Sequence, residues 1–251
     1  MNYCFSQINL PERASKPRSK GISMILDKGL GLRELNDLLE TAGSFIDIVK
    51  LGWGTSLTQG IELVKQKCEL LARHQVLVCP GGTLTELAYF QNKLDWYLDE
   101  ARNLGFSCIE VSNGTIPILQ DEKLKIIHQA IQAGFRVTSE VGSKISEEDQ
   151  KITMEERISQ IQSELDAGVW KVILEARESG TQGIFNKSGV TQLDLLNQIT
   201  SQINADDLIF EAPQRNQQSD LILSIGNNVN LGNIAPSDVI PLETLRLGLR
   251  S

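Results

Sequence analysis

Eight short apolar runs alternate with amphipathic segments along almost the whole chain, and this alternation limits the possible folds more than any other feature. The segments between the runs repeat apolar residues at helical spacing. The runs themselves have the continuous apolar character of strands that are buried on both faces. They lie at residues 22–29, 45–54, 75–82, 107–114, 135–142, 171–180, 207–213 and 228–235. Repeated strand–helix units of this kind build a parallel sheet.

The number of units favours a closed sheet over an open one. Eight strands and about eight helices within 251 residues match the usual size of a (β/α)8 barrel, the TIM barrel. An open doubly wound sheet is the alternative, but it calls for a GxGxxG turn after the first strand, and Gly29 and Gly31 lack the third glycine. We therefore predict an α/β fold with a single barrel over residues 21–251, preceded by an N-terminal arm over residues 1–20.

Composition narrows the range of partners and locations. The formal net charge is −8 and no run of Lys or Arg interrupts it, which argues against nucleic acid or an anionic membrane as a partner. No apolar stretch approaches the roughly 20 residues that a membrane span requires. The first 20 residues lack the apolar core of a signal peptide, so a cytoplasmic location is predicted.

Histidine and cysteine are too sparse to suggest the usual catalytic or metal-binding patterns. The only histidines, His74 and His128, fall within or at the end of predicted helices, and the four cysteines show no CxxC spacing. Proton transfer in an enzyme of this sequence must therefore use Lys, Glu, Asp or Tyr.

A polar residue stands at the end of nearly every predicted strand, at intervals close to one or two strand–helix units. In a barrel these positions share the C-terminal rim, where active sites lie. Carboxylates on consecutive strands repel one another, and a hard divalent cation such as Mg²⁺ relieves the repulsion. A structural lattice of ion pairs is the alternative. The set comprises Asp27, Lys50, Glu110, Glu140, Glu175, Glu211 and Asn230.

Basic residues accompany this ring and indicate an anionic substrate. Lys50 and Arg177 belong to the predicted rim, and Lys28 and Lys144 follow ring positions by one and four residues. We expect Glu178 to orient Arg177 or a neighbouring lysine. Trp53, in the segment GWGTS, either lines a pocket or packs at a strand end.

Two glycines open the helix that follows the third predicted strand. Gly81 and Gly82 lie in the segment PGGT, at the expected start of that helix. Backbone N–H groups at such a helix start can receive an anion, such as a phosphate or carboxylate of the substrate.

Nine segments of the chain resemble the phosphosulfolactate synthase family, from about residue 16 to the C-terminus. They are LDKG, VKLGWGTS, PGGTL, IEVSNGT, SEVGSK, EARESG, IFEAP, VNLGNI and LETLRLGLRS. The resemblance implies a Mg²⁺-dependent barrel that adds sulfite to phosphoenolpyruvate. The product is (2R)-phospho-3-sulfolactate, a precursor in coenzyme M biosynthesis, formed through an aci-carboxylate intermediate that a lysine protonates.

The same resemblance suggests roles for individual residues. Lys144 matches the lysine of the SEVG-x-K segment and is the expected proton donor, while Arg177, Lys50 and Lys28 hold phosphate or sulfite. The expected metal ligands are Glu110, Glu140 and Glu175, with Asp27 and Glu211 in reserve. The remaining candidates for substrate binding are Gly81, Gly82, Ser112, Glu178, Asn230 and Asn233.

Two alternatives stay open from sequence. One is a related enolate-forming lyase with a different substrate, and the other is a barrel retained for stress protection without catalysis. The entry of the product into coenzyme M or free sulfolactate is also open, as is assembly into a homo-oligomer.

Overall fold

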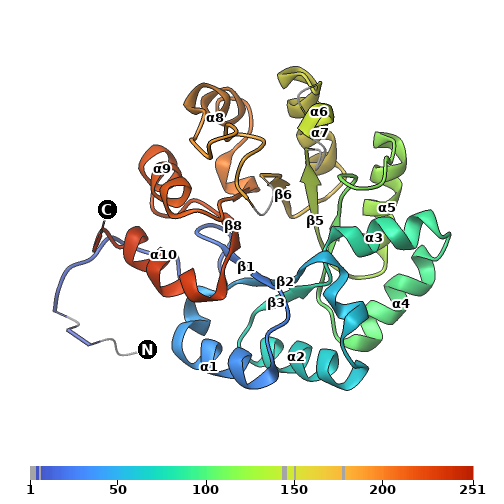
Figure 1. The fold of residues 1–251 in the computed structure, drawn as a ribbon, viewed down its shortest axis with the longest axis horizontal. Coiled ribbons are helices and arrows are strands. Elements are labelled where there is room, and N and C mark those ends of the chain that lie inside the picture. Colours follow the sequence, from blue (N-terminus) through green and yellow to red (C-terminus); the bar gives the residue numbers. More distant parts are fainter. Residues whose placement is uncertain (1–3, 6, 143–145, 150, 177–178, 251) are drawn as a thin grey trace.

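The protein folds into a nearly closed barrel of eight parallel strands surrounded by helices, as Figure 1 shows along the barrel axis. The computed structural model describes residues 4–5, 7–142, 146–149, 151–176 and 179–250. The strands are β1 (Ser23–Asp27), β2 (Ile48–Leu51), β3 (Leu77–Cys79), β4 (Cys108–Val111), β5 (Arg136–Val141), β6 (Lys171–Leu174), β7 (Leu208–Glu211) and β8 (Leu231–Ile234). All eight fall inside the predicted apolar runs, and the predicted (β/α)8 barrel is confirmed.

Seven of the eight joins between neighbouring strands are parallel pairings, in the order β3-β2-β1-β8-β7-β6-β5-β4. The remaining join, between β3 and β4, has no strand pairing among the described residues, and its backbone hydrogen bond comes from Ser107, just before β4. The backbone N–H of Ser107 donates to the carbonyl of Val78 at 3.1 Å, and the Ser107 hydroxyl accepts from the Val78 N–H at 3.0 Å. Ser107 therefore closes the barrel where strand pairing does not.

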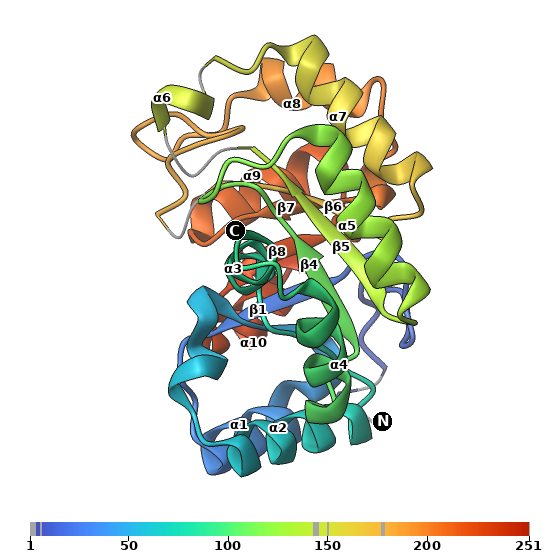
Figure 2. The same ribbon diagram turned by 90° about the vertical axis from the view of Figure 1, so that its right-hand side faces the viewer.

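The helices cover the outside of the barrel (Figure 2), and the longer ones bury an apolar stripe against it. In α1, for example, Leu35, Leu39 and Ala42 form that stripe. The helices are α1 (Leu32–Ala42), α2 (Ile61–Arg73), α3 (Gly82–Phe90), α4 (Leu94–Leu104), α5 (Gln120–Gln132), α6 (Ser146–Asp149), α7 (Met154–Asp166), α8 (Leu193–Thr200), α9 (Arg215–Ile225) and α10 (Val239–Arg246). Both α3 and α4 lie between β3 and β4.

Strand residues alternate between the helix layer and the barrel interior, as the pleat of a strand requires. Side chains such as Ile25 and Val49 belong to the large core under the helices. The interior holds a separate cluster, namely Ile22, Met24, Ile48, Cys79, Cys108, Ile173 and Ile209. Inward residues two positions after members of this cluster lie above it, at the C-terminal mouth of the barrel.

The opposite end of the barrel is sealed by the segment before β1 and by the end of α10. Arg13 pairs with Glu243 at 2.8 Å, and Arg18 pairs with Asp47 at 2.9 Å. Arg246, only 1% exposed, donates to the carbonyls of Asn227, Val229 and Ile22. Charges at this end are therefore matched by opposite charges or by backbone carbonyls.

Within the described residues, no helix combines the length and the apolar character needed to cross a membrane.

Candidate functional site

A cavity of about 710 Å³ opens at the C-terminal mouth of the barrel. Its floor carries four glutamates and one lysine from five strands or strand ends, and the other lining residues are small or polar apart from one leucine and one tryptophan. The lining residues are Leu26, Lys50, Trp53, Gly81, Gly82, Thr83, Glu110, Thr115, Glu140, Glu175, Ser179, Glu211 and Asn233. Most of the predicted ring thus lies on one cavity.

Three glutamates on neighbouring strands form the centre of this floor. Glu140 on β5, Glu175 directly after β6 and Glu211 at the end of β7 are each no more than 4% exposed. Each contributes a carboxylate oxygen to a group whose members all lie within 4.8 Å of one another. Burial raises the pKa of Glu211, and the neighbouring Glu140 and Glu110 raise it further, against the opposing effect of Lys50.

Lys50 lies among the glutamates as their counterion. Its Nζ is 2.9 Å from Glu110 Oε1 and 3.5 Å from both Glu140 Oε2 and Glu211 Oε1. Burial alone lowers the pKa of Lys50, but these three carboxylates together raise it well above its ordinary value. Lys50 therefore stays protonated at neutral pH and supplies fixed positive charge rather than a titrating acid or base.

Glu110 is held by the start of α3. Its Oε1 accepts from the Gly82 N–H at 2.8 Å, and its own carbonyl accepts from the Thr85 hydroxyl at 2.8 Å. A Cβ at Gly82 would lie 2.7 Å from Ser112 Cβ and 3.0 Å from Glu110 Oε1, so only glycine fits there. Glu110 Oε2 is buried and has no hydrogen-bond partner among the residues that the structure describes.

Trp53 lines the rim of the cavity, which decides between its two predicted positions. It is 51% exposed and adopts a left-handed φ of 56°, an uncommon conformation for a bulky residue. Lys28 Nζ lies 5.0 Å from the centre of its ring, so the indole holds a lysine beside the mouth. Asn233, with a φ of 54°, lines the same cavity.

Asp27 does not belong to the cavity floor, and its predicted place in the ring is wrong. It ends β1, but the inward residue of that strand is Leu26, and Asp27 faces the helix layer. There it forms a fully buried pair with Lys67 of α2 at 2.9 Å. The other carboxylate oxygen accepts from the N–H groups of Gly29 and Leu30.

Asn230 and Ser112 are also placed differently from the prediction. Asn230 precedes β8 and therefore lies at the N-terminal end of the barrel, where its amide donates to the carbonyls of Asp206 and Leu208. Ser112 is 1% exposed and donates its hydroxyl to Glu86 rather than lining the cavity. Lys144, Arg177 and Glu178 lie outside the described residues.

Sequence reasoning missed several buried charges in the helix layer. Lys123 of α5 is 1% exposed and donates to the carbonyl of Glu140 and to Glu164 of α7, both at 2.7 Å. Glu86 of α3 is fully buried. The sequence contains one indication, because each of these residues occurs at helical spacing from the apolar residues of the buried face. Polar residues in a helix usually lie on its surface, however, so this indication is weak.

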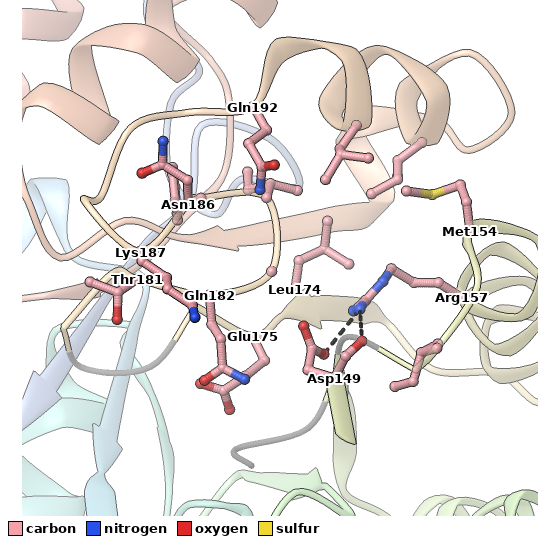
Figure 3. Close-up of a pocket in the computed structure, with 16 residues that line it drawn as sticks. Asp149, Met154, Arg157, Leu174, Glu175, Thr181, Gln182, Asn186, Lys187 and Gln192 are labelled. Carbon is pink, nitrogen blue, oxygen red and sulfur yellow. Dashed lines mark hydrogen bonds and ion pairs between the residues drawn. The ribbon is translucent and has the colours of Figure 1, made fainter. Parts of the chain in front are cut away.

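A second cavity, of about 410 Å³, adjoins the first and shares Glu175 with it (Figure 3). Arg157 of α7 donates to Asp149 of α6 at 3.0 Å on one side of it. Ile184, Phe185 and Leu195 give it an apolar wall. This buried ion pair lies next to the strand end that carries Glu175.

The floor of the larger cavity has the chemistry of a divalent cation site. Three mutually close carboxylates offer hard oxygen ligands, and the buried Glu110 Oε2 is a further oxygen nearby. Three of these carboxylates also share Lys50 as an ion-pair partner, and carboxylates this close together repel one another unless a cation lies among them.

Comparison with known proteins gives one consistent family. The family described as (2R)-phospho-3-sulfolactate synthase (ComA) matches residues 11–251. Phosphosulfolactate synthase of Methanothermobacter thermautotrophicus is 43% identical over 241 residues, which cover 96% of this chain and 93% of the relative. Phosphosulfolactate synthase of Bacillus subtilis is 43% identical over 246 residues, which cover 97% and 96% respectively.

A solved structure supports the fold. Phosphonopyruvate hydrolase in complex with oxalate and Mg²⁺ is 13% identical, with a TM-score of 0.58 over 88% of this chain and 77% of that chain. At this identity the likeness concerns the barrel architecture alone.

Proposed function

The chain belongs to the (2R)-phospho-3-sulfolactate synthase family and is an enzyme of the lyase type, and from this premise we propose that it adds sulfite to phosphoenolpyruvate in the barrel mouth. The observation that carries the proposal is the floor of the 710 Å³ cavity, where buried carboxylates gather around Lys50. Both substrates are anions, so they need positive charge in the site. The acidic floor can supply it by binding a divalent cation.

Glu140, Glu175 and Glu211 are the residues that we assign to Mg²⁺, with Glu110 held beside them by Gly82 and Lys50. Compared with the ligands expected from sequence, Glu211 takes the place of Glu110, and Asp27 is left out. When bound, Mg²⁺ would supply a Lewis acid that stabilises negative charge on the substrate carboxylate.

The chemistry consists of one bond formed and one proton gained. The sulfur lone pair of sulfite forms a bond to the methylene carbon of phosphoenolpyruvate. The π electron pair of the double bond moves to the neighbouring carbon and into the carboxylate as an aci-carboxylate. A proton delivered to one face of that carbon then completes (2R)-phospho-3-sulfolactate.

The remaining residues bind and protonate in this proposal. Lys50 keeps its charge and orients the glutamates, and Lys28, fixed over Trp53, holds phosphate or sulfite at the rim. Lys144 is the proposed proton donor and Arg177 an anion-binding residue, both on the strength of the segments SEVGSK and EARESG. A cytoplasmic location and a homo-oligomer belong to the same proposal.

The test is to incubate the protein with phosphoenolpyruvate, sulfite and Mg²⁺ and follow the sulfonate product by NMR. We expect product formation that EDTA abolishes and excess Mg²⁺ restores. Lys144→Ala should lose turnover while still binding phosphoenolpyruvate, whereas Lys125→Ala, an exposed lysine of α5, should match the wild type. Absence of sulfonate with the wild-type protein would refute the proposal, and full activity of Lys144→Ala would refute the proton donor.

The same assay separates the two alternatives. Turnover of phosphoenolpyruvate or a related phosphorylated acid without sulfite would indicate a different enolate-forming lyase. Failure of every such substrate would favour a non-catalytic barrel.

A further inference from the structure

We propose that Thr115 contacts the substrate in the cavity wall and that Glu86 of α3 is the residue that positions it. This inference rests on the proposed function, because it concerns the same cavity. Neither residue was singled out by the sequence patterns at the strand ends.

Glu86 is a fully buried carboxylate that holds the loop after β4. Its Oε1 accepts from the Ser112 hydroxyl and from the Gly114 N–H, the latter at 3.2 Å. Its Oε2 accepts from the N–H groups of Thr115 at 2.9 Å and Ile116 at 2.6 Å. Three successive backbone donors and one hydroxyl therefore converge on one side chain, and hydrogen bonds to an ionised carboxylate are the stronger kind.

The loop so held reaches the cavity at one residue. Thr115 is exposed and lines the cavity, together with Gly81, Gly82 and Thr83 from the start of α3. Its hydroxyl has no hydrogen bond within the part of the chain that the structure describes, whereas its N–H is bound to Glu86. The side chain is thus fixed at its backbone and open at its hydroxyl, as expected of a group that donates to a ligand.

Glu86 and the acidic floor share one rigid support. The helix α3 that carries Glu86 also binds Glu110, through the Gly82 N–H at 2.8 Å and the Thr85 hydroxyl at 2.8 Å. Ser112 packs into the space that a side chain at Gly82 would occupy. The helix α3 therefore fixes the position of Thr115 relative to the cavity floor. If Glu86 releases the loop, Thr115 moves, while Gly82 and Thr85 still hold Glu110 in place.

The experiment compares Thr115→Val, Thr115→Ser and Glu86→Gln with the wild type. Loss of a hydrogen bond to a charged substrate should raise KM for phosphoenolpyruvate by about tenfold or more in Thr115→Val, with kcat and thermal stability little changed. Thr115→Ser keeps the hydroxyl and should retain wild-type KM. Glu86→Gln, which replaces one acceptor with an amide donor, should raise the same KM.

Two further measurements separate positioning from stability. Hydrogen exchange at the amides of Gly114, Thr115 and Ile116 should be slow in the wild type and at least about tenfold faster in Glu86→Gln, because their acceptor is weakened. The control is Asp47→Asn at the opposite end of the barrel, a buried carboxylate that also accepts a backbone N–H, from Ser23 at 2.9 Å. It should lower stability without changing KM.

Unchanged KM in Thr115→Val would overturn the substrate contact, and unchanged amide exchange in Glu86→Gln would overturn the positioning role. A wild-type protein that neither binds nor converts phosphoenolpyruvate would refute the proposed function and, with it, the contact to that substrate. The exchange rates would still decide whether Glu86 holds the loop.

Discussion

The two ends of this barrel both bury charge, but they treat it in opposite ways. At the N-terminal end, Arg18 pairs with Asp47, and Arg246 is surrounded by backbone carbonyls. At the C-terminal end, Lys50 is the counterion for three of the four glutamates on the described floor. At the N-terminal end each described charge lies beside an opposite charge or backbone carbonyls, whereas at the C-terminal end several carboxylates lie within 4.8 Å of one another and repel, a cost that a bound cation can relieve. In the proposed function, the C-terminal end therefore serves binding, while the contacts at the N-terminal end hold the fold together.

Neutralising one glutamate of the cavity floor is expected to have the largest effect on activity. We expect Glu175→Gln to lower kcat/KM on the order of 100-fold or more, since it removes a proposed metal ligand. The melting temperature should stay level or rise, because the variant has less repulsion among carboxylates. Glu69→Gln, on the exposed face of α2, is the matched control and should change neither quantity. A marked loss of stability in Glu175→Gln would mean that the floor is a structural lattice after all.

Removal of Lys50 tests the same cavity floor by taking away its positive charge. Lys50→Met leaves three buried carboxylates without the ammonium group that pairs with them, and it should cost about 3–5 kcal/mol in the free energy of unfolding. Added Mg²⁺ should recover part of that loss in the variant, as measured by thermal unfolding with and without the cation. A variant as stable as the wild type would show that Lys50 does not hold the floor together.

The pH dependence of Lys50→Met has a definite sign. A carboxyl group whose pKa is raised in the folded state binds its proton more tightly when folded, so stability increases as the pH falls through that value. Loss of Lys50 removes the main influence that lowers the pKa of Glu211. The gap in melting temperature between Lys50→Met and the wild type should therefore narrow as the pH is lowered from neutral, and a gap that widens would contradict the proposed repulsion.

At the N-terminal end, Arg246→Met should affect stability alone. It removes one donor from each of the carbonyls of Asn227, Val229 and Ile22, and we expect a loss of about 2–4 kcal/mol in the free energy of unfolding. Denaturant unfolding measures the loss, while kcat and KM at a temperature where the variant is folded should match the wild type. A selective loss of kcat in Arg246→Met would break the division of labour between the two ends.

The smallest effect is expected at the rim of the cavity. Trp53→Leu removes the ring that holds Lys28, an interaction of about 1 kcal/mol or less at an exposed site. In Trp53→Leu, KM for phosphoenolpyruvate should rise about threefold to fivefold with kcat unchanged. The KM of Trp53→Phe should lie between those of Trp53→Leu and the wild type. An unchanged KM in Trp53→Leu would remove Lys28 from the proposed binding groups.

Much of the fold could be predicted because buried parallel strands have a simple signature. The continuous apolar runs located all eight strands, and their polar ends located Lys50, Glu110, Glu140, Glu175 and Glu211 on one cavity. The two misplaced ring residues result from the alternation of side chains along a strand and from the choice of strand ends. Asp27 is one residue beyond the inward position of β1, and Asn230 precedes its strand, and alignment by apolar residues does not determine either.

The buried partners could not be predicted, for a different physical reason. Glu86 and Lys123 are charged residues in helices, where charged side chains usually lie on the surface, and helical periodicity alone does not distinguish a buried acid with four donors from a surface one. Only the packing of α3 against the loop after β4 reveals what Glu86 binds.

The join at Ser107 has a consequence for solubility. If it opened, β3 and β4 would become the two edges of an open sheet, each presenting unpaired backbone groups to neighbouring molecules. Such edges add strands from other chains, which is how sheet proteins begin to aggregate. The two hydrogen bonds between Ser107 and Val78 therefore help to keep these strand edges from being exposed.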